Sequence, residues 1–257
     1  MTYMFLGQSG ILLDLGDNRL VLIDPYLSDS VEEKYGGALR RRFPPPSIEA
    51  YIRHVTHVFV THAHEDHADP ASLQMIVEYS PNVEIYGPAD AEPLLCKLPD
   101  VHNRFRRMDS CSDIVCGTVH IGGVPAAHTQ LEIDSNGMPT CMGYLIEFSG
   151  KRIYHSGDTM PHPEIVSAVN KIGPPDVAFL PCNERNYYRE RAGIIGNMSV
   201  REMLGFAAEI GAAKIIPIHW DLFEPNTTEP EEIRLVHLAS ACQIPIEIPE
   251  HGLWKLL

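Results

Sequence analysis

Three histidines and an aspartate fall within six consecutive residues, as His62, His64, Asp66 and His67, directly after the apolar run Val55–Val60. Imidazole nitrogens and carboxylate oxygens are ligands that suit zinc and similar divalent ions. Because side chains alternate along an extended strand end, His62 and His64 are expected to point the same way, and Asp66 and His67 can turn toward a second ion. Core packing does not explain this density of histidine, so the segment predicts metal ligation.

Three later residues stand where further ligands of a two-metal hydrolytic site would be expected. His128, Asp158 and His219 each follow an apolar run, at the place where an α/β sheet presents its functional residues. Glu65, between the ligands of the first segment, is expected to face away into solvent. The chain shows no serine or cysteine nucleophile signature and no phosphate-binding loop, so a metal-bound hydroxide is the expected nucleophile.

The elements that must position these residues are mainly strands in the first third of the chain. Gly7–Gly10 and Asp17–Asn18 supply the turns between the first three of them. Strands and helices then alternate, which indicates two packed sheets flanked by helices. The predicted strands are 3–6, 11–15, 20–23, 55–60, 83–86, 118–124, 144–148, 152–154, 177–180 and 215–218, and the predicted helices are 71–79, 163–170, 199–210 and 229–240.

Residues 25–50 do not follow either periodicity. Pro44, Pro45 and Pro46 can continue neither a helix nor a central strand, so the whole stretch is interpreted as one long loop. Loops of this length are often functional.

Length and charge narrow the class of protein. With 257 residues the chain fits one large domain or two fused halves, and a single domain over residues 1–257 is predicted. A formal net charge of -14 argues against a nucleic-acid partner, which would require clustered cations. The N-terminal residues resemble neither a signal peptide nor a membrane span. The six cysteines are interpreted as reduced, buried thiols, so the predicted location is the cytoplasm, without a membrane partner.

The motif set resembles that of the metallo-β-lactamase superfamily. The matching residues are His62-x-His64-x-Asp66-His67, His128, Asp158 within Ser156-Gly157-Asp158-Thr159, and His219. The resemblance implies a four-layer αββα sandwich of the α/β (α+β) class. It also implies that His62, His64 and His128 bind one ion, that Asp66, His67 and His219 bind another, and that Asp158 bridges them. By the same resemblance, the catalytic Asp66 holds the hydroxide as well as an ion.

A narrower resemblance is to the ascorbate-6-phosphate lactonase-like branch. The matching stretches are Tyr154–Asp158, Pro181–Arg185, Met198–Leu204 and Ile216–Asp221, with Gly7–Gly10 and Asp24-Pro25 near the start. That branch carries an acidic residue near the third histidine position, where this chain has His128. The difference points to a sister enzyme with a different substrate.

Residues outside the metal motif have two interpretations each. His155, just before Ser156-Gly157-Asp158, is either a catalytic proton-handling residue or a hydrogen-bonded core histidine. Asn183, Arg185 and Arg191 lie in a polar segment after a strand, which either binds an anionic substrate group or forms a solvated loop.

The sequence therefore predicts a metal-dependent hydrolase that opens the lactone of a sugar acid, possibly phosphorylated, so that the partner is a small anionic molecule. The alternatives are a phosphodiesterase of the same fold and a non-catalytic metal-binding protein. Two divalent ions are expected, and the ligands permit zinc, manganese or iron. A homo-oligomer is compatible with the sequence.

Overall fold

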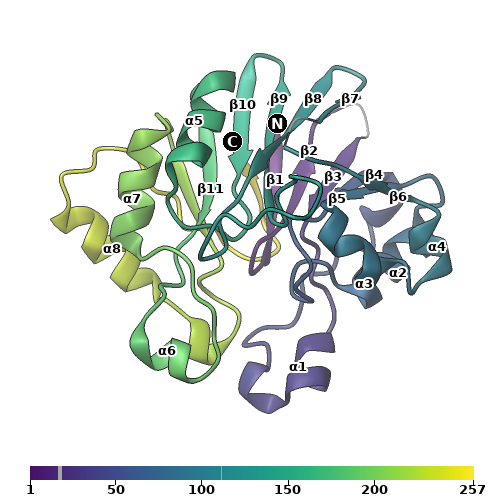
Figure 1. Ribbon diagram of the computed structural model, residues 1–257, viewed down its shortest axis with the longest axis horizontal. Helices are drawn as coiled ribbons and strands as arrows, with labels where there is room; N and C mark the ends of the chain where they lie inside the picture. Colours follow the sequence, from purple (N-terminus) through teal and green to yellow (C-terminus); the bar gives the residue numbers. More distant parts are fainter. Residues whose placement is uncertain (17–18, 111) are drawn as a thin grey trace. The chain divides into compact units, whose positions relative to one another are not determined.

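The described residues, 1–16, 19–110 and 112–257, form two β-sheets in the computed structural model, and each sheet carries its own helices (Figure 1). The chain divides into two units, residues 1–108 with 250–257 and residues 109–249. The mixture of strands and helices confirms the predicted α/β class, whereas one domain over residues 1–257 stays a prediction. The expected turn Asp17–Asn18 and Cys111 lie outside the described residues.

The first unit contains a sheet with the strand order β13-β1-β2-β3-β4-β5-β6. Strands β1, β2 and β3 pair antiparallel, whereas β3, β4, β5 and β6 run parallel. The residues that follow β3 and β4 therefore emerge at the same edge of the sheet. The strands are β1 (Thr2–Gly7), β2 (Gly10–Asp14), β3 (Leu20–Ile23), β4 (Val55–Phe59), β5 (Glu84–Gly87), β6 (Phe105–Arg107) and β13 (Trp254–Leu256).

Helix α2 (Pro70–Tyr79) packs on this sheet through an apolar cluster. Leu73 and Ile76 of the helix are fully buried in one cluster with Val58 of β4 and Ile85 of β5. Asp69 caps the helix by accepting a hydrogen bond from a backbone N–H of its first turn, as the sequence predicts. The other helical segments are α1 (Ser30–Tyr35), η1 (Gly37–Leu39), η2 (Ile52–His54), η3 (Ala89–Ala91), α3 (Glu92–Leu95) and α4 (Pro99–His102).

The second unit contains a sheet with the strand order β12-β11-β10-β9-β8-β7. Strands β10, β11 and β12 are parallel, and β8 and β10 are both antiparallel to β9. The residues that follow β8, β10, β11 and β12 therefore emerge at one edge. The strands are β7 (Asp113–Cys116), β8 (Val119–Pro125), β9 (Met142–Phe148), β10 (Lys151–His155), β11 (Val177–Pro181) and β12 (Ile215–Ile218).

Helices of the second unit pack on this sheet and on each other (Figure 1). Helix α5 (Pro163–Ile172) contacts β8, and α7 (Val200–Glu209) contacts β11 and α8 (Pro230–Ala239). Ser199 and Glu202 form the predicted capping box at the start of α7. Two short elements, α6 (Tyr187–Arg191) and η4 (Glu224–Asn226), lie in the loops after β11 and β12.

The predicted loop over residues 25–50 is wrong in part, because it contains α1 and η1. A six-residue helix is too short to show a 3.6-residue periodicity, and α1 depends on side-chain contacts made elsewhere in its unit. The sequence also did not indicate β6, β7, β13, α3, α4 or α6. Each of these is five residues or shorter.

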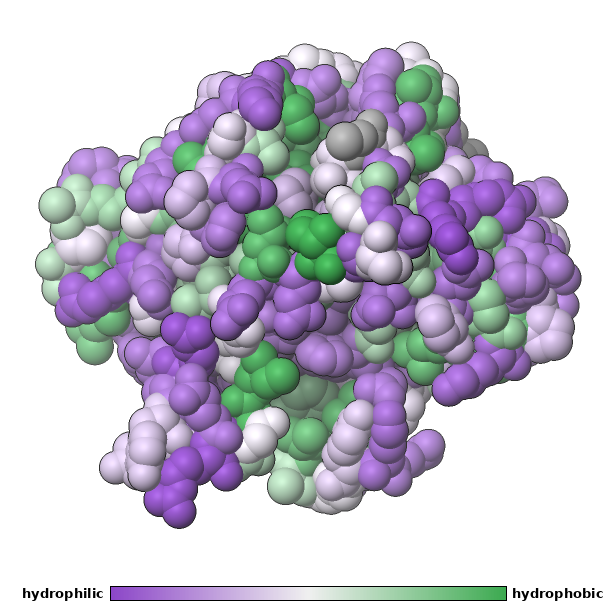
Figure 2. All heavy atoms as spheres, in the orientation of Figure 1, coloured by the Kyte–Doolittle hydropathy of each residue, from purple (hydrophilic) through white to green (hydrophobic). Residues whose placement is uncertain are grey.

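The structure also bears on the expectations about the surface, membrane spans and the cysteines. Hydrophilic residues predominate on the face drawn in Figure 2. Among the residues that the structure describes, each helix is too short or too polar to span a bilayer. Cys96, Cys141, Cys182 and Cys242 are free thiols, as predicted, but only Cys182 is fully buried. The prediction of buried thiols is therefore wrong for the other three, which lie partly at the surface.

Candidate metal centre

The histidine-rich segment leaves β4 beside the carboxyl end of β3. Asp24 directly follows β3, and its carboxylate is fully buried. Its Oδ1 accepts a hydrogen bond from the Thr61 backbone N–H at 2.8 Å, and its Oδ2 accepts one from the Thr61 hydroxyl at 2.7 Å. These two bonds fix the start of the ligand segment against the neighbouring strand.

The same carboxylate orients His67. Asp24 Oδ2 lies 2.8 Å from His67 Nδ1, and both side chains are fully buried. Because a carboxylate oxygen only accepts, Nδ1 carries the proton, and the neutral ring then has its lone pair on Nε2. A carboxylate behind a metal-binding imidazole fixes the ring and raises its basicity. Asp24 therefore prepares His67 Nε2 as a ligand atom.

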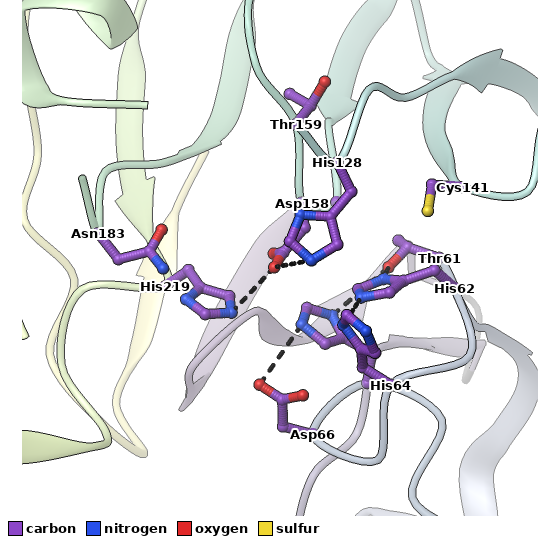
Figure 3. Close-up of polar contacts among 12 residues, drawn as sticks. Thr61, His62, His64, Asp66, His128, Cys141, Asp158, Thr159, Asn183 and His219 are labelled. Carbon is purple, nitrogen blue, oxygen red and sulfur yellow. Dashed lines mark hydrogen bonds and ion pairs between the residues drawn. The ribbon is translucent and has the colours of Figure 1, made fainter. Parts of the chain in front are cut away.

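His62 and His64 bring two ring nitrogens together. Thr61 Oγ1 gives its proton to Asp24 and lies 3.0 Å from His62 Nδ1, so it accepts a hydrogen bond from that nitrogen. The lone pair of His62 is then on Nε2, which lies 2.9 Å from His64 Nδ1 (Figure 3). Two imidazole ligands of one tetrahedral zinc ion would hold their nitrogens roughly 3.3 Å apart. The pair is thus arranged to share one ion.

Asp66 is held in place by Gln8, in the turn between β1 and β2. Gln8 Nε2 donates to Asp66 Oδ2 at 2.6 Å, and that oxygen lies 3.6 Å from His67 Nε2. The carboxylate and the imidazole nitrogen therefore lie at a separation that suits two ligands of a common ion.

The sequence predicted that Glu65 faces solvent, but its carboxylate is engaged by helix α1. Lys34 Nζ and Tyr35 Oη, both at the end of α1, donate to its carboxylate, the latter at 3.1 Å. Burial raises the pKa of Glu65, but the hydrogen bonds from Lys34, Tyr35 and its own backbone N–H, together with the charge of Lys34, outweigh burial, so the pKa lies below its ordinary value. Helix α1 is therefore attached to the segment that carries the candidate ligands.

In the second unit the predicted ligands meet at the common edge of the sheet. His128 follows β8, Asp158 follows β10 and His219 follows β12. Asp158 Oδ2 lies 3.8 Å from His128 Nε2 and 3.2 Å from His219 Nε2 (Figure 3). One carboxylate oxygen between two imidazole nitrogens is the arrangement expected of a carboxylate that bridges two ions.

Thr159 ties together the two segments that carry His128 and Asp158. The Ala127 backbone N–H donates to Thr159 Oγ1 at 3.0 Å, and the Met160 N–H donates to the Ala127 carbonyl at 2.7 Å. Because Thr159 is fully buried, these bonds are protected from water and hold the two ligand segments in register.

His155 is fully buried at the end of β10. Its Nδ1 accepts a hydrogen bond from the Gly157 backbone N–H at 3.2 Å, across the turn that leads to Asp158. This contact favours the second of the two interpretations, in which His155 is a hydrogen-bonded core histidine that shapes the turn.

Backbone strain accompanies three of these residues. Gln8 has φ 56°, Asp24 has φ 46° and His219 has φ 54°, in the left-handed region that side chains other than glycine rarely adopt. Such conformations cost of order 1–3 kcal/mol each and cluster at functional sites. The surrounding hydrogen bonds hold Asp24 in this conformation.

The predicted substrate residues lie in different environments. Asn183 is fully buried after β11, and its Nδ2 donates to Asn226 Oδ1 at 3.1 Å. Arg185 is partly exposed and pairs with Glu190 at 3.6 Å. Arg191 is exposed and lies over the ring of Tyr187. All three lie at or near the carboxyl end of β11 or in α6.

Arg189, between the latter two arginines, has a structural role. Its guanidinium donates to the carbonyls of Asn183, Glu184 (2.8 Å) and Thr227 (2.6 Å), and burial lowers its pKa. It therefore joins the loop after β11 to the loop after β12.

The donors fit divalent metal ions. All are imidazoles or carboxylates, and most are buried with fixed orientations, a set that zinc, manganese and iron accept. The candidate residues are His62, His64, Asp66 and His67 in the first unit, and His128, Asp158 and His219 in the second.

The sequence pattern did not point to Asp24, Gln8 or Thr61 as functional residues. Asp24 carries a detectable signal, because it is a carboxylate directly after the apolar strand Leu20–Ile23. Gln8 and Thr61 carry none. Their partners, Asp66 and Asp24, are distant in the sequence, and only the fold brings them together.

Comparison with known proteins decides the family. The model of the β-lactamase superfamily domain matches residues 19–220, which include all seven candidate ligands. The chain belongs to the β-lactamase superfamily. Within this superfamily, a UPF0173 metal-dependent hydrolase of Thermococcus kodakarensis is 27% identical over 238 residues, covering 90% of this chain and 89% of the relative.

Two solved structures share the superfamily fold. The metallo hydrolase Igni18 of Ignicoccus hospitalis has a TM-score of 0.73 at 19% identity, covering 99% of this chain and 97% of its own. An isothiocyanate hydrolase from Delia radicum gut bacteria has a TM-score of 0.76 at 20% identity, and the match covers 100% of this chain and 99% of the hydrolase. The predicted metallo-β-lactamase fold is confirmed.

Proposed function

We propose that this chain is a metal-dependent hydrolase that opens the lactone ring of a sugar acid, with two ions held in the ligand sets that the family resemblance implies. The observation that carries the proposal is Asp158 Oδ2, placed 3.2 Å and 3.8 Å from the ligand nitrogens of His219 and His128. The names of the relatives support hydrolysis. The stretches shared with the ascorbate-6-phosphate lactonase-like branch support the lactone.

When bound, the metal ions would lower the pKa of water and polarise the carbonyl that is attacked. Asp66, fixed by Gln8, would accept the proton of the attacking water and return it to the ring oxygen that leaves. Asp24 would hold His67 in the tautomer that leaves Nε2 unprotonated. His155 would keep the turn before Asp158 in place. Ring opening suits such a site because the leaving alkoxide stays tethered to the product.

Lactones are expected to be better substrates than phosphodiesters. Hydrolysis of a phosphodiester is favoured by several fixed cations around the phosphoryl oxygens. Arg189 cannot serve as such a cation, because its guanidinium already donates to three backbone carbonyls. The comparison is of kcat/KM for sugar lactones, phosphorylated and not, against bis(p-nitrophenyl) phosphate and an isothiocyanate, with one metal-loaded preparation. A preference of about tenfold or more for the phosphodiester, ~1.4 kcal/mol of transition-state binding, would replace the lactonase proposal by the phosphodiesterase one.

Arg185→Ala is expected to raise KM for a phosphorylated lactone by about tenfold, ~1.4 kcal/mol, with little change in kcat. Arg185 is partly exposed, and its 3.6 Å pair with Glu190 is weak enough to exchange for a substrate anion. The unphosphorylated lactone should show no such change in KM.

Arg189→Ala is the matched control. It should lower the free energy of unfolding by about 1–3 kcal/mol, because three backbone carbonyls, two of them in partly buried contacts, lose their donor. It should have no selective effect on the phosphorylated substrate. An unchanged KM in Arg185→Ala would remove Arg185 from the substrate site.

A further inference from the structure

Buried carboxamides that lack hydrogen-bond partners gather in one part of the second unit. Asn183 Oδ1 and both polar side-chain atoms of Asn197 have no partner among residues 1–16, 19–110 and 112–257, and both side chains are fully buried. A buried polar atom left without a partner costs about 1–3 kcal/mol. Native proteins keep such groups where a water, an ion or a ligand supplies the missing hydrogen-bond partner.

The two asparagines lie in neighbouring segments. Asn183 follows β11, and Asn197 precedes the cap of α7. The backbone N–H of Glu184 donates to Met198 O, and that of Arg185 donates to Asn197 O, both at 3.0 Å, so these segments run side by side. The carboxamides therefore belong to one local region rather than to unrelated parts of the core.

The orientation of the Asn183 amide follows from its one side-chain bond. Nδ2 donates to Asn226 Oδ1 at 3.1 Å, which leaves the carbonyl oxygen Oδ1 as the atom to be completed. Figure 3 shows this carboxamide beside the ring of His219, which follows the neighbouring strand β12. Asn183 Oδ1 thus lies at the edge of the sheet that carries the candidate ligands of this unit.

The chemistry of the missing partner follows from the charges around Asn183. An amide oxygen accepts hydrogen bonds and cannot donate them, so a carboxylate or phosphate oxygen is excluded as its partner. The Arg189 guanidinium donates to the Asn183 and Glu184 carbonyls and is not directed at a ligand. A hydroxyl group of a ligand can supply the donor that Asn183 Oδ1 requires.

We propose that Asn183 Oδ1 accepts a hydrogen bond from a hydroxyl group of the substrate, and that Asn197 lies in the same carboxamide-lined subsite for a polyhydroxylated ligand. This inference rests on the proposed function and specifies its substrate class as hydroxylated lactones rather than simple aliphatic ones. A site built to bond a hydroxyl group rejects the analogue without it, because the buried acceptor then stays unpaired.

The test compares D-glucono-δ-lactone with δ-valerolactone, which has the same ring without hydroxyl groups. Asn183→Leu should lower the ratio of their kcat/KM values at least about tenfold, by slowing the hydroxylated substrate. Asn226→Asp is the control, since an aspartate oxygen still accepts the hydrogen bond of Asn183 Nδ2 and leaves Asn183 Oδ1 in the same orientation. A merely structural role would affect both lactones equally, so an unchanged ratio in Asn183→Leu overturns the inference while the lactonase proposal stands.

If the wild-type protein opens neither lactone, the proposed function fails. The role of Asn183 is then tested by ligand binding. Calorimetry would then compare D-gluconate with valerate on the metal-loaded protein. Asn183→Leu should weaken the binding of D-gluconate about tenfold or more and leave that of valerate unchanged, and Asn226→Asp should stay close to the wild type in this ratio. Equal D-gluconate affinity in the wild-type and Asn183→Leu proteins, or no wild-type binding, overturns the inference.

Discussion

His64→Ala or Asp158→Ala is expected to remove bound metal and to lower kcat/KM at least about a thousandfold, ~4 kcal/mol of transition-state stabilisation. His64 Nδ1 lies 2.9 Å from His62 Nε2, and Asp158 Oδ2 lies between two imidazole nitrogens, so each loss opens a ligand position. Elemental analysis of the purified variants and kcat/KM on the preferred lactone provide the measurements.

Glu65→Gln is the matched control, because this residue lies between the candidate ligands and its side chain contacts Lys34 and Tyr35 instead. It should retain metal. Chelation of the wild-type protein should also lower Tm, because an ion that binds only the folded state stabilises it by mass action. Wild-type protein that is active with no metal would contradict the metallohydrolase proposal.

Asp24→Asn is expected to weaken metal binding by about 10–100-fold, although Asp24 is not itself a proposed ligand. An asparagine Nδ2 facing His67 Nδ1 would donate where the carboxylate accepts at 2.8 Å. The proton of His67 would then move to Nε2, the nitrogen that must bind the ion. The Thr61 bonds would be partly lost, which should lower the free energy of unfolding by about 1–3 kcal/mol.

Thr61→Ser separates these effects, since it keeps the hydroxyl that donates to Asp24 at 2.7 Å and the backbone N–H that donates at 2.8 Å. It should bind metal nearly as the wild type does. The measurements are metal titration by calorimetry and denaturant unfolding of the metal-free proteins. An Asp24→Asn protein with wild-type metal affinity would show that the tautomer of His67 does not limit binding.

The candidate ligands could be proposed from the sequence because each one follows a strand that the sequence predicts. A strand such as Ile215–Ile218 is readable from its composition, and the polar residue directly after it, His219, must lie at the sheet edge. The strand register then brings Asp158 and His219 together, since β10, β11 and β12 are parallel neighbours. Spacing alone was sufficient for this part of the candidate site.

What could not be predicted depends on pairings between distant residues. The hydrogen bonds from Gln8 to Asp66 and from Lys34 to Glu65 join residues far apart in the sequence, so no periodicity of the sequence indicates them. The arginine-rich segment is similar: composition treats Arg185, Arg189 and Arg191 alike, but only the fold shows that backbone carbonyls occupy Arg189. Such roles follow from geometry and not from residue type.

Strand β13 has a consequence for how the chain is made. It pairs with β1, with Thr2 opposite Leu256 and Met4 opposite Trp254, so one side of β1 is covered by residues that lie far along the sequence. During translation β1 leaves the ribosome long before β13, because strands β2 to β12 lie between them in the sequence. In the interval β1 presents open backbone groups, which template pairing with another chain. The nascent protein therefore passes through a period in which β1 can pair with another chain, and this period ends only when β13 adds to the sheet.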